Sequence, residues 1–208
     1  MSSLLSHDIC DPILEASWLG VGSMAKNGNS PLHFACTTNA LGLVDYLIMN
    51  GISVNETNRM GETPLHWSCL NENPNIMQRL IYFGAISKAN KEGDCPIHWA
   101  CEAGNLACVK ILSDLESTDL GAMNEENYTP IELACQSGSL EVVQFLSSYV
   151  PITSELLHIA CENDQCEILE FLLANFEFTL DSKDSPLETA LGMERTDCVA
   201  ILIKYNCK

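Results

Sequence analysis

The sequence predicts an all-α protein, a solenoid of stacked helix–turn–helix units joined by short finger loops. A seven-residue motif recurs along the chain at a nearly constant period. An apolar stripe at helical spacing follows each copy, and glycine or a short polar run ends each unit. One such unit cannot bury its apolar face alone, whereas a stack of units buries a continuous core.

The recurring motif marks the start of a helix. Its four clear copies are SPLHFAC at 30–36, TPLHWSC at 63–69, CPIHWAC at 95–101 and TPIELAC at 129–135. Their prolines lie 33, 32 and 34 residues apart, and weaker copies follow at 156–161 and 185–190. Because a Ser or Thr hydroxyl can cap free amides and proline fits the first helical turn, each copy is suited to a helix N-terminus.

The residues after each motif predict a turn and a second helix. A polar tetrad comes first, as at 37–40 and 136–139. An apolar stripe at helical spacing follows, for example at Leu43, Leu47 and Ile48. A glycine near the end of the unit, such as Gly51 or Gly84, suits a left-handed helix C-cap. Each unit is therefore expected to hold two helices.

This pattern resembles the ankyrin repeat, whose period is about 33 residues and whose signature is T-P-L-H-x-A. The resemblance covers roughly residues 8–206 and implies one domain over 1–208, with about five to six repeats. The expected parts are an N-terminal cap at 8–26, repeats at 27–58, 59–90, 91–124, 125–151 and 152–181, and a C-terminal capping repeat at 182–208.

Two positions depart from the repeat pattern. Glu132 replaces the histidine in the fourth copy, which puts the local hydrogen-bond network of that repeat in question. The finger before the fifth repeat is cut short around Pro151. Either the stack bends at this finger, or the loop is simply trimmed.

The charge balance points away from nucleic acid and toward a protein partner. Ten Lys+Arg against 28 Asp+Glu give a formal net charge of -18. So acidic a surface repels phosphate backbones, whereas it speeds encounters with a basic protein surface or tail. Solubility alone remains an alternative explanation for the acidity.

The acidic residues are concentrated in one part of the chain. Between Lys110 and Lys183 there is no Lys or Arg, and this stretch holds 14 of the 28 acidic side chains. Two interpretations stay open: a solvated outer face, or a dock for a basic segment. The dock is favoured if Glu125, Glu126 and Glu132 share the concave side of the stack.

Cysteine usage and the lack of long apolar runs bear on location. The 11 cysteines, an odd number, fit free thiols in a reducing compartment better than a disulfide framework. We read no secretory signal at the N-terminus, and no apolar run approaches the roughly 20 residues that span a bilayer. A cytoplasmic or nuclear location without membrane contact is expected.

No motif predicts an enzyme, a cofactor or a metal site. His-x-x-Cys occurs four times, but a structural zinc site needs four ligands and these pairs lie one repeat apart. We expect the histidines to link repeats and the cysteines at the repeated position to pack as small apolar residues. The cysteines outside that repeated position have no distinctive sequence context: Cys10, Cys95, Cys108, Cys166, Cys198 and Cys207.

The resemblance also implies where a partner binds. In the ankyrin family, the fingers and first helices line a concave face that is the usual contact surface. Carried over to this chain, it gives these predicted contacts: Arg59, Glu62, Trp67, Glu72, Lys91, Asp94, Trp99, Glu102, Glu125, Glu126, Tyr128 and Glu132. Trp67 and Trp99 are expected to be partly exposed, because tryptophan is common at binding hot spots. Ordinary packing against the next repeat is the alternative.

These observations predict a non-enzymatic protein–protein interaction module, an adaptor or an inhibitor, that acts as a monomer. The alternative is an acidic mimic or chaperone that sequesters a basic, nucleic-acid-binding protein. That second function predicts steep salt dependence and contacts within residues 111–182. An aromatic-centred adaptor would be less sensitive to salt. A spacer without a specific partner is a further possibility.

Overall fold

A computed structural model describes residues 27–38, 40–71, 73–178 and 185–205, and every regular element in these ranges is an α-helix. The helices come in consecutive pairs. The pairs are α3 (Pro31–Thr37) with α4 (Leu41–Met49), α5 (Pro64–Ser68) with α6 (Asn75–Tyr82), α7 (Pro96–Glu102) with α8 (Leu106–Ser113), α9 (Pro130–Gln136) with α10 (Leu140–Leu146), α11 (Glu155–Glu162) with α12 (Cys166–Asn175), and α13 (Pro186–Gly192) with α14 (Thr196–Lys204). The all-α prediction is confirmed.

The chain forms two compact units. The first holds residues 1–100, 107–119 and 124–126, and the second holds residues 101–106, 120–123 and 127–208. Each helix pair lies within the bounds predicted for its repeat. The single domain over 1–208 stays a prediction, and the N-terminal cap expected at 8–26 lies outside the described residues.

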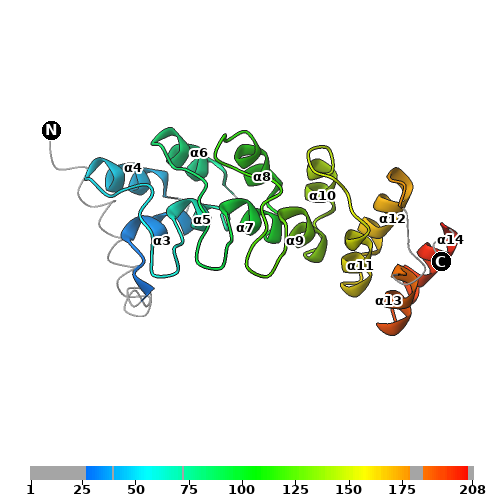
Figure 1. Cartoon of the computed structure of the whole chain (residues 1–208). Helices are drawn as coiled ribbons and strands as arrows, with labels where there is room; N and C mark the ends of the chain where they lie inside the picture. The colour runs from blue at the N-terminus through cyan, green and yellow to red at the C-terminus, as the bar shows by residue number, and fades with distance from the viewer. Residues whose placement is uncertain (1–26, 39, 72, 179–184, 206–208) are drawn as a thin grey trace. The chain divides into compact units, whose positions relative to one another are not determined.

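In the first unit, the helices form two rows. Figure 1 shows the first helices of the repeats, α3, α5 and α7, beside one another, with α4, α6 and α8 in a second row above them in this view. Helix α3 packs against both α4 and α5, and α4 packs against α6. The interior is filled by fully buried side chains: Leu32, Leu65, Ile76, Met77, Leu80 and Ile97. The repeated cysteines of this unit, Cys36 and Cys69, are also fully buried, as their position predicted.

Buried histidines join the first repeat to the second and the second to the third. His66 Nδ1 accepts a hydrogen bond from Thr63 N at 3.0 Å, and its Nε2 lies 2.9 Å from the carbonyl oxygen of Asp94. Since Nδ1 accepts from a backbone amide, Nε2 carries the proton and donates it to that carbonyl. His33 repeats the arrangement, with Nε2 3.0 Å from the carbonyl oxygen of Glu62. The predicted role of these histidines is confirmed.

The second unit keeps the paired helices but changes the links between them. Glu132 takes the place of the histidine and completes a capping box, because its Oε2 accepts hydrogen bonds from Thr129 N and Oγ1, each at 2.7 Å. This keeps the cap of α9. Between α10 and α11 the connection spans only residues 147–154. The second unit has its own interior, which includes Val142, Val143, Leu146, Leu157, Leu169 and Leu172.

Candidate partner-binding surface

The fingers of the first unit are tied together by backbone hydrogen bonds. Arg59 N donates to Asn27 O at 2.8 Å, and Lys91 N donates to Met60 O at 2.8 Å. Glu125 N donates to the carbonyl of Glu92 at 2.9 Å in the same way. In three successive fingers, the backbone of a predicted contact residue is therefore held in place by a hydrogen bond to the preceding finger.

A close approach between fingers requires glycine at Gly93. Its φ is +78°, a conformation that favours glycine, and a Cβ there would lie 2.7 Å from Glu125 N and 2.9 Å from Asn124 Cα. Within the same finger, Asn90 Oδ1 accepts hydrogen bonds from the amides of Glu92 and Asp94, each at 2.9 Å. The finger is thus fixed both by its own turn and by the finger beside it.

Two predicted contact residues, Glu62 and Asp94, occupy the same position in successive fingers. Glu62 Oε2 accepts hydrogen bonds from Asn58 Nδ2 at 2.6 Å and from Trp67 Nε1 at 2.9 Å. Asp94 Oδ1 accepts one from Asn124 Nδ2 at 2.8 Å. Both side chains are half-buried. Because the histidines also bind the carbonyls of both residues, backbone and carboxylate are held together.

Trp67 lies beside the Glu62 carboxylate, and both tryptophans are half-buried, which confirms the predicted partial exposure. The Trp67 ring meets Phe34 edge-on, with centroids 6.0 Å apart, and Trp99 meets His66 at 5.5 Å. Packing against the preceding repeat therefore accounts for part of the burial of each ring. The Trp67 N–H is used within the protein, so its open surface offers a partner mainly apolar area.

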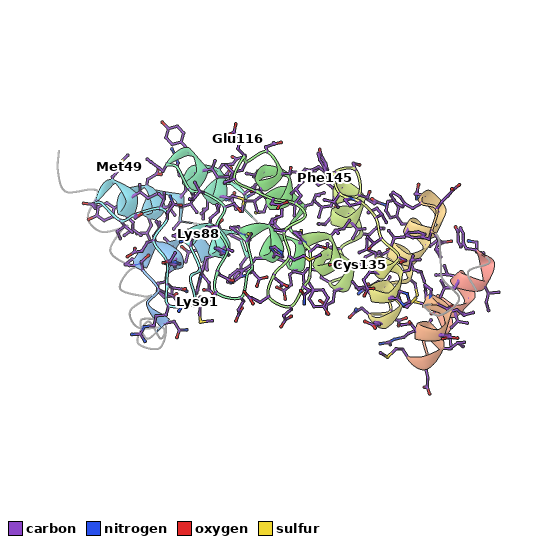
Figure 2. All side chains as sticks on the ribbon, viewed as in Figure 1. Met49, Lys88, Lys91, Glu116, Cys135 and Phe145 are labelled. Carbon is purple, nitrogen blue, oxygen red and sulfur yellow. The ribbon has the colours of Figure 1, made fainter. Side chains whose placement is uncertain are left out.

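The charge at the finger tips changes sign along the chain. Arg59 and Lys91 are exposed at equivalent positions of the second and third fingers, while Glu125 and Glu126 are exposed in the next finger. Figure 2 shows Lys91 at the finger tips, on the side of the first unit away from Met49. A partner that crosses these fingers thus meets cationic and then anionic groups.

The remaining predicted contacts have less in common. Glu102 is exposed and Tyr128 half-buried, and both belong to the second unit. Glu132, also in the second unit, uses its carboxylate to cap α9. Glu72 lies outside the described residues. That all these residues form one partner surface stays a prediction.

The repeated histidine–cysteine pairs have structural roles. Both ring nitrogens of His33 and His66 are engaged in the caps and links described above, which leaves neither ring nitrogen for a metal ion. Burial raises the pKa of Cys36 and of Cys135 to about 12, so both are thiols at neutral pH and poor nucleophiles. Sequence reasoning missed a different cluster, Asp164 with Cys166 and Cys198, because Cys198 is 32 residues from Cys166 and belongs to the next repeat.

A shallow apolar hollow lies in the second unit. It measures about 210 Å³ and is lined mainly by apolar side chains: Leu120, Met123, Ile131, Val150, Pro151 and Leu156. Glu132 is the ionisable residue in its lining. Among the described residues, no helix combines the length and apolar character needed to cross a membrane.

Comparison with known proteins agrees with this architecture. A family model described as "Ankyrin repeats (3 copies)" matches residues 3–90 and 70–156, and one described as "Ankyrin repeat" matches residues 154–181. A search of curated protein sequences finds no match.

Solved structures with the same fold include two ankyrin repeat domains. That of human ASB11 has a TM-score of 0.74 at 24% identity and covers 86% of this chain and 85% of its own. That of Bcl-3, described as a unique member of the IkappaB protein family, has a TM-score of 0.71 at 24% identity, covering 88% of each chain. At this identity the likeness concerns the fold alone. The family models span more than half of the sequence, and the chain belongs to the ankyrin repeat family.

Proposed function

We propose that this chain is a non-enzymatic module that binds a protein partner through the finger side of its first unit. Ankyrin repeat domains generally mediate protein–protein interactions, so the fold supports this class of function. The observation that carries the proposal is the fixed pair of carboxylates, Glu62 and Asp94, each held through its backbone by a histidine and through its side chain by an amide. A surface ordered before binding loses less conformational entropy on association.

The chemistry of the pair indicates the kind of segment it accepts. A carboxylate offers about four lone-pair sites, so Glu62 and Asp94 retain acceptor capacity toward a Lys or Arg side chain. Half-buried Trp67 and Trp99 add apolar area beside them. Arg59 and Lys91 at the tips favour an acidic or polar neighbour. The proposed partner segment therefore places basic side chains against the inner positions and acidic ones over the tips, an alternation that also rejects uniformly charged chains.

The test is affinity capture from a cell lysate with three baits at low and moderately high salt. The first bait is the wild-type chain, and the second carries Glu62→Gln and Asp94→Asn. The amide oxygens of Gln and Asn still accept the internal hydrogen bonds, so the charge is removed while the fold is kept. The third bait, a matched control, carries Glu141→Gln and Glu167→Gln, which neutralise two exposed acids of the second unit.

A partner retained by the wild type and the control, but lost by the Glu62→Gln and Asp94→Asn bait, supports the proposal. Retention by all three baits contradicts the finger site. Loss of the partner only with the control bait would indicate that the partner binds the second unit instead. Circular dichroism of each bait verifies that a lost partner does not reflect an unfolded bait.

The acidic mimic or chaperone is a second candidate, favoured by the exposure of acids in the second unit. Exposed members include Glu141, Glu155, Glu162, Glu167 and Glu177, and the stretch from 111 to 182 contains no Lys or Arg. Such a surface would hold a basic protein mainly by long-range attraction. Capture that fails steeply with salt and is competed by duplex nucleic acid would favour this function over the finger site.

Location and oligomeric state are part of the proposal. We propose a cytoplasmic or nuclear protein that acts as a monomer. The cysteines of the described residues are free thiols, which fits a reducing compartment. Fractionation of the source cells tests the location, and light scattering of the purified chain tests the oligomeric state.

A further inference from the structure

Three potential metal ligands converge at one corner of the second unit. Asp164 lies in the turn between α11 and α12, Cys166 begins α12, and Cys198 belongs to α14. The two sulfur atoms are 3.3 Å apart. Asp164 Oδ1 lies 3.9 Å from Cys166 Sγ and 3.7 Å from Cys198 Sγ. The turn and two helices from different repeats thus bring two sulfurs and one carboxylate oxygen together.

These separations are close to the edges of a tetrahedral zinc site. With Zn–S near 2.3 Å and Zn–O near 2.1 Å, ligands at tetrahedral angles lie about 3.8 Å apart for two sulfurs and about 3.6 Å apart for a sulfur and an oxygen. The two S–O distances lie within about 0.3 Å of this value, whereas the S–S distance of 3.3 Å is about 0.5 Å shorter, so the sulfurs would move apart slightly to bind the ion. A disulfide would instead require the two sulfurs to approach to about 2.05 Å. The spacing favours a shared ion over a direct bond.

Two of the three residues differ from their counterparts in the third and fourth repeats. The third and fourth repeats have Gly104 and Gly138 where the fifth has Asp164, and all three positions have positive φ. Glu194 has a positive φ at the equivalent position of the last repeat, and aspartate is one of the few non-glycine residues that adopt this conformation, so the backbone permits Asp164 without requiring it. Similarly, Cys166 replaces the leucine that begins α10 at Leu140.

The cluster has one open side and one counter-charge. Cys198 is fully buried, Cys166 is half-buried, and the Asp164 side chain is 50% exposed. A fourth position is therefore accessible to water. Arg195 places Nη1 3.7 Å from Asp164 Oδ2, while its Nη2 donates to the carbonyl of Glu162 at 3.1 Å. Two thiolates and one carboxylate carry three negative charges, which a zinc ion and the Arg195 guanidinium balance.

We propose that Asp164, Cys166 and Cys198 bind a zinc ion, with water as the fourth ligand, and that the ion fastens α12 to α14. The ligand set of sulfur and oxygen suits zinc, which accepts Cys, His and carboxylate ligands. Zinc binds thiolates, and the protons displaced from the sulfurs pass to solvent as it binds. The bound ion would join the last two repeats of the second unit.

The test measures zinc affinity of the full-length chain, reduced with a phosphine, in competition with a chromophoric chelator. We expect the wild type to bind one equivalent of zinc. The affinity of Cys166→Ser for zinc should be at least about 100-fold weaker, because even changes to residues that only support the ligands cost 10- to 100-fold. Cys95→Ser, which changes a half-buried cysteine of the first unit, is the matched control and should bind as the wild type does. Cobalt as a probe should give a thiolate charge-transfer band that Cys166→Ser weakens.

A second variant separates ligation from folding. Asp164→Gly relieves the left-handed backbone, so it should raise the melting temperature of the metal-free chain while it weakens zinc binding. Zinc should raise the melting temperature of the wild type more than that of this variant. Unchanged zinc affinity in Cys166→Ser or Asp164→Gly would overturn the assignment. A Cys166–Cys198 disulfide found by mass spectrometry in chain isolated from cells would overturn it as well.

Discussion

Replacing Gly93 with alanine tests whether close contact between fingers stabilises the first unit. The alanine Cβ would lie 2.7 Å from Glu125 N and 2.9 Å from Asn124 Cα, and both are backbone atoms that cannot rotate away. The positive φ adds a cost of about 1–2 kcal/mol for any residue with a Cβ. Overpacking adds about 1–3 kcal/mol. We therefore expect Gly93→Ala to reduce the free energy of unfolding by about 2–5 kcal/mol.

Gly84→Ala is the matched control for this experiment. Its φ of +89° imposes a similar backbone cost, but a Cβ at Gly84 meets nothing within 4 Å. The control should lose only about 1–2 kcal/mol. Urea unfolding followed by circular dichroism gives both values from the transition midpoints, provided the slopes agree. Equal losses in the two variants would refute the reasoning, because they would mean that the fingers do not resist the added methyl group.

The remaining predictions concern the cap, the indole and the buried histidines. Glu132→Ala removes the carboxylate that caps α9 and should cost about 1–2 kcal/mol in urea unfolding, whereas Glu132→Gln, whose amide oxygen still accepts, should cost less. Trp67→Phe keeps a ring but removes the N–H bound to Glu62, so it should cost about 1 kcal/mol, and no loss would show that this bond is dispensable. Burial lowers the pKa of His33 and His66 below 6.5 in the folded chain, so the unfolded chain binds the extra protons and stability falls as pH drops through and below 6.5. His66→Gln should flatten this fall between about pH 7.5 and about pH 5.5, and a slope equal to that of the wild type would contradict the sign.

The architecture could be predicted because the repeat encodes it locally. The Thr–Pro start, the histidine after it and the small residues at the end of the motif recur together, and each has a role within its own helix or toward the next repeat. His66 illustrates this, since its cap partner Thr63 is three residues away and its second partner, Asp94, lies in the next finger. A periodic chain repeats such contacts at a fixed distance in sequence, which makes them visible without a structure.

The candidate site was less predictable. The resemblance pointed to finger residues in general, but it did not distinguish Glu62 and Asp94, whose carboxylates are held by amides, from Glu132, whose carboxylate caps a helix. Nor did the sequence indicate that the Trp67 N–H is already used by Glu62. These differences depend on side-chain orientation, which the repeat period does not fix.

The sequence by itself determined the repeat, the paired helices, the acidic charge and the packing role of the repeated cysteines. These follow from composition and from contacts within a repeat or between adjacent ones. Only the tertiary structure decided which carboxylates are held at the fingers and that Cys166 and Cys198, 32 residues apart, bring their sulfurs within 3.3 Å. Stacking places equivalent positions of neighbouring repeats side by side, so residues with no distinctive sequence context can form a cluster once the helices pack.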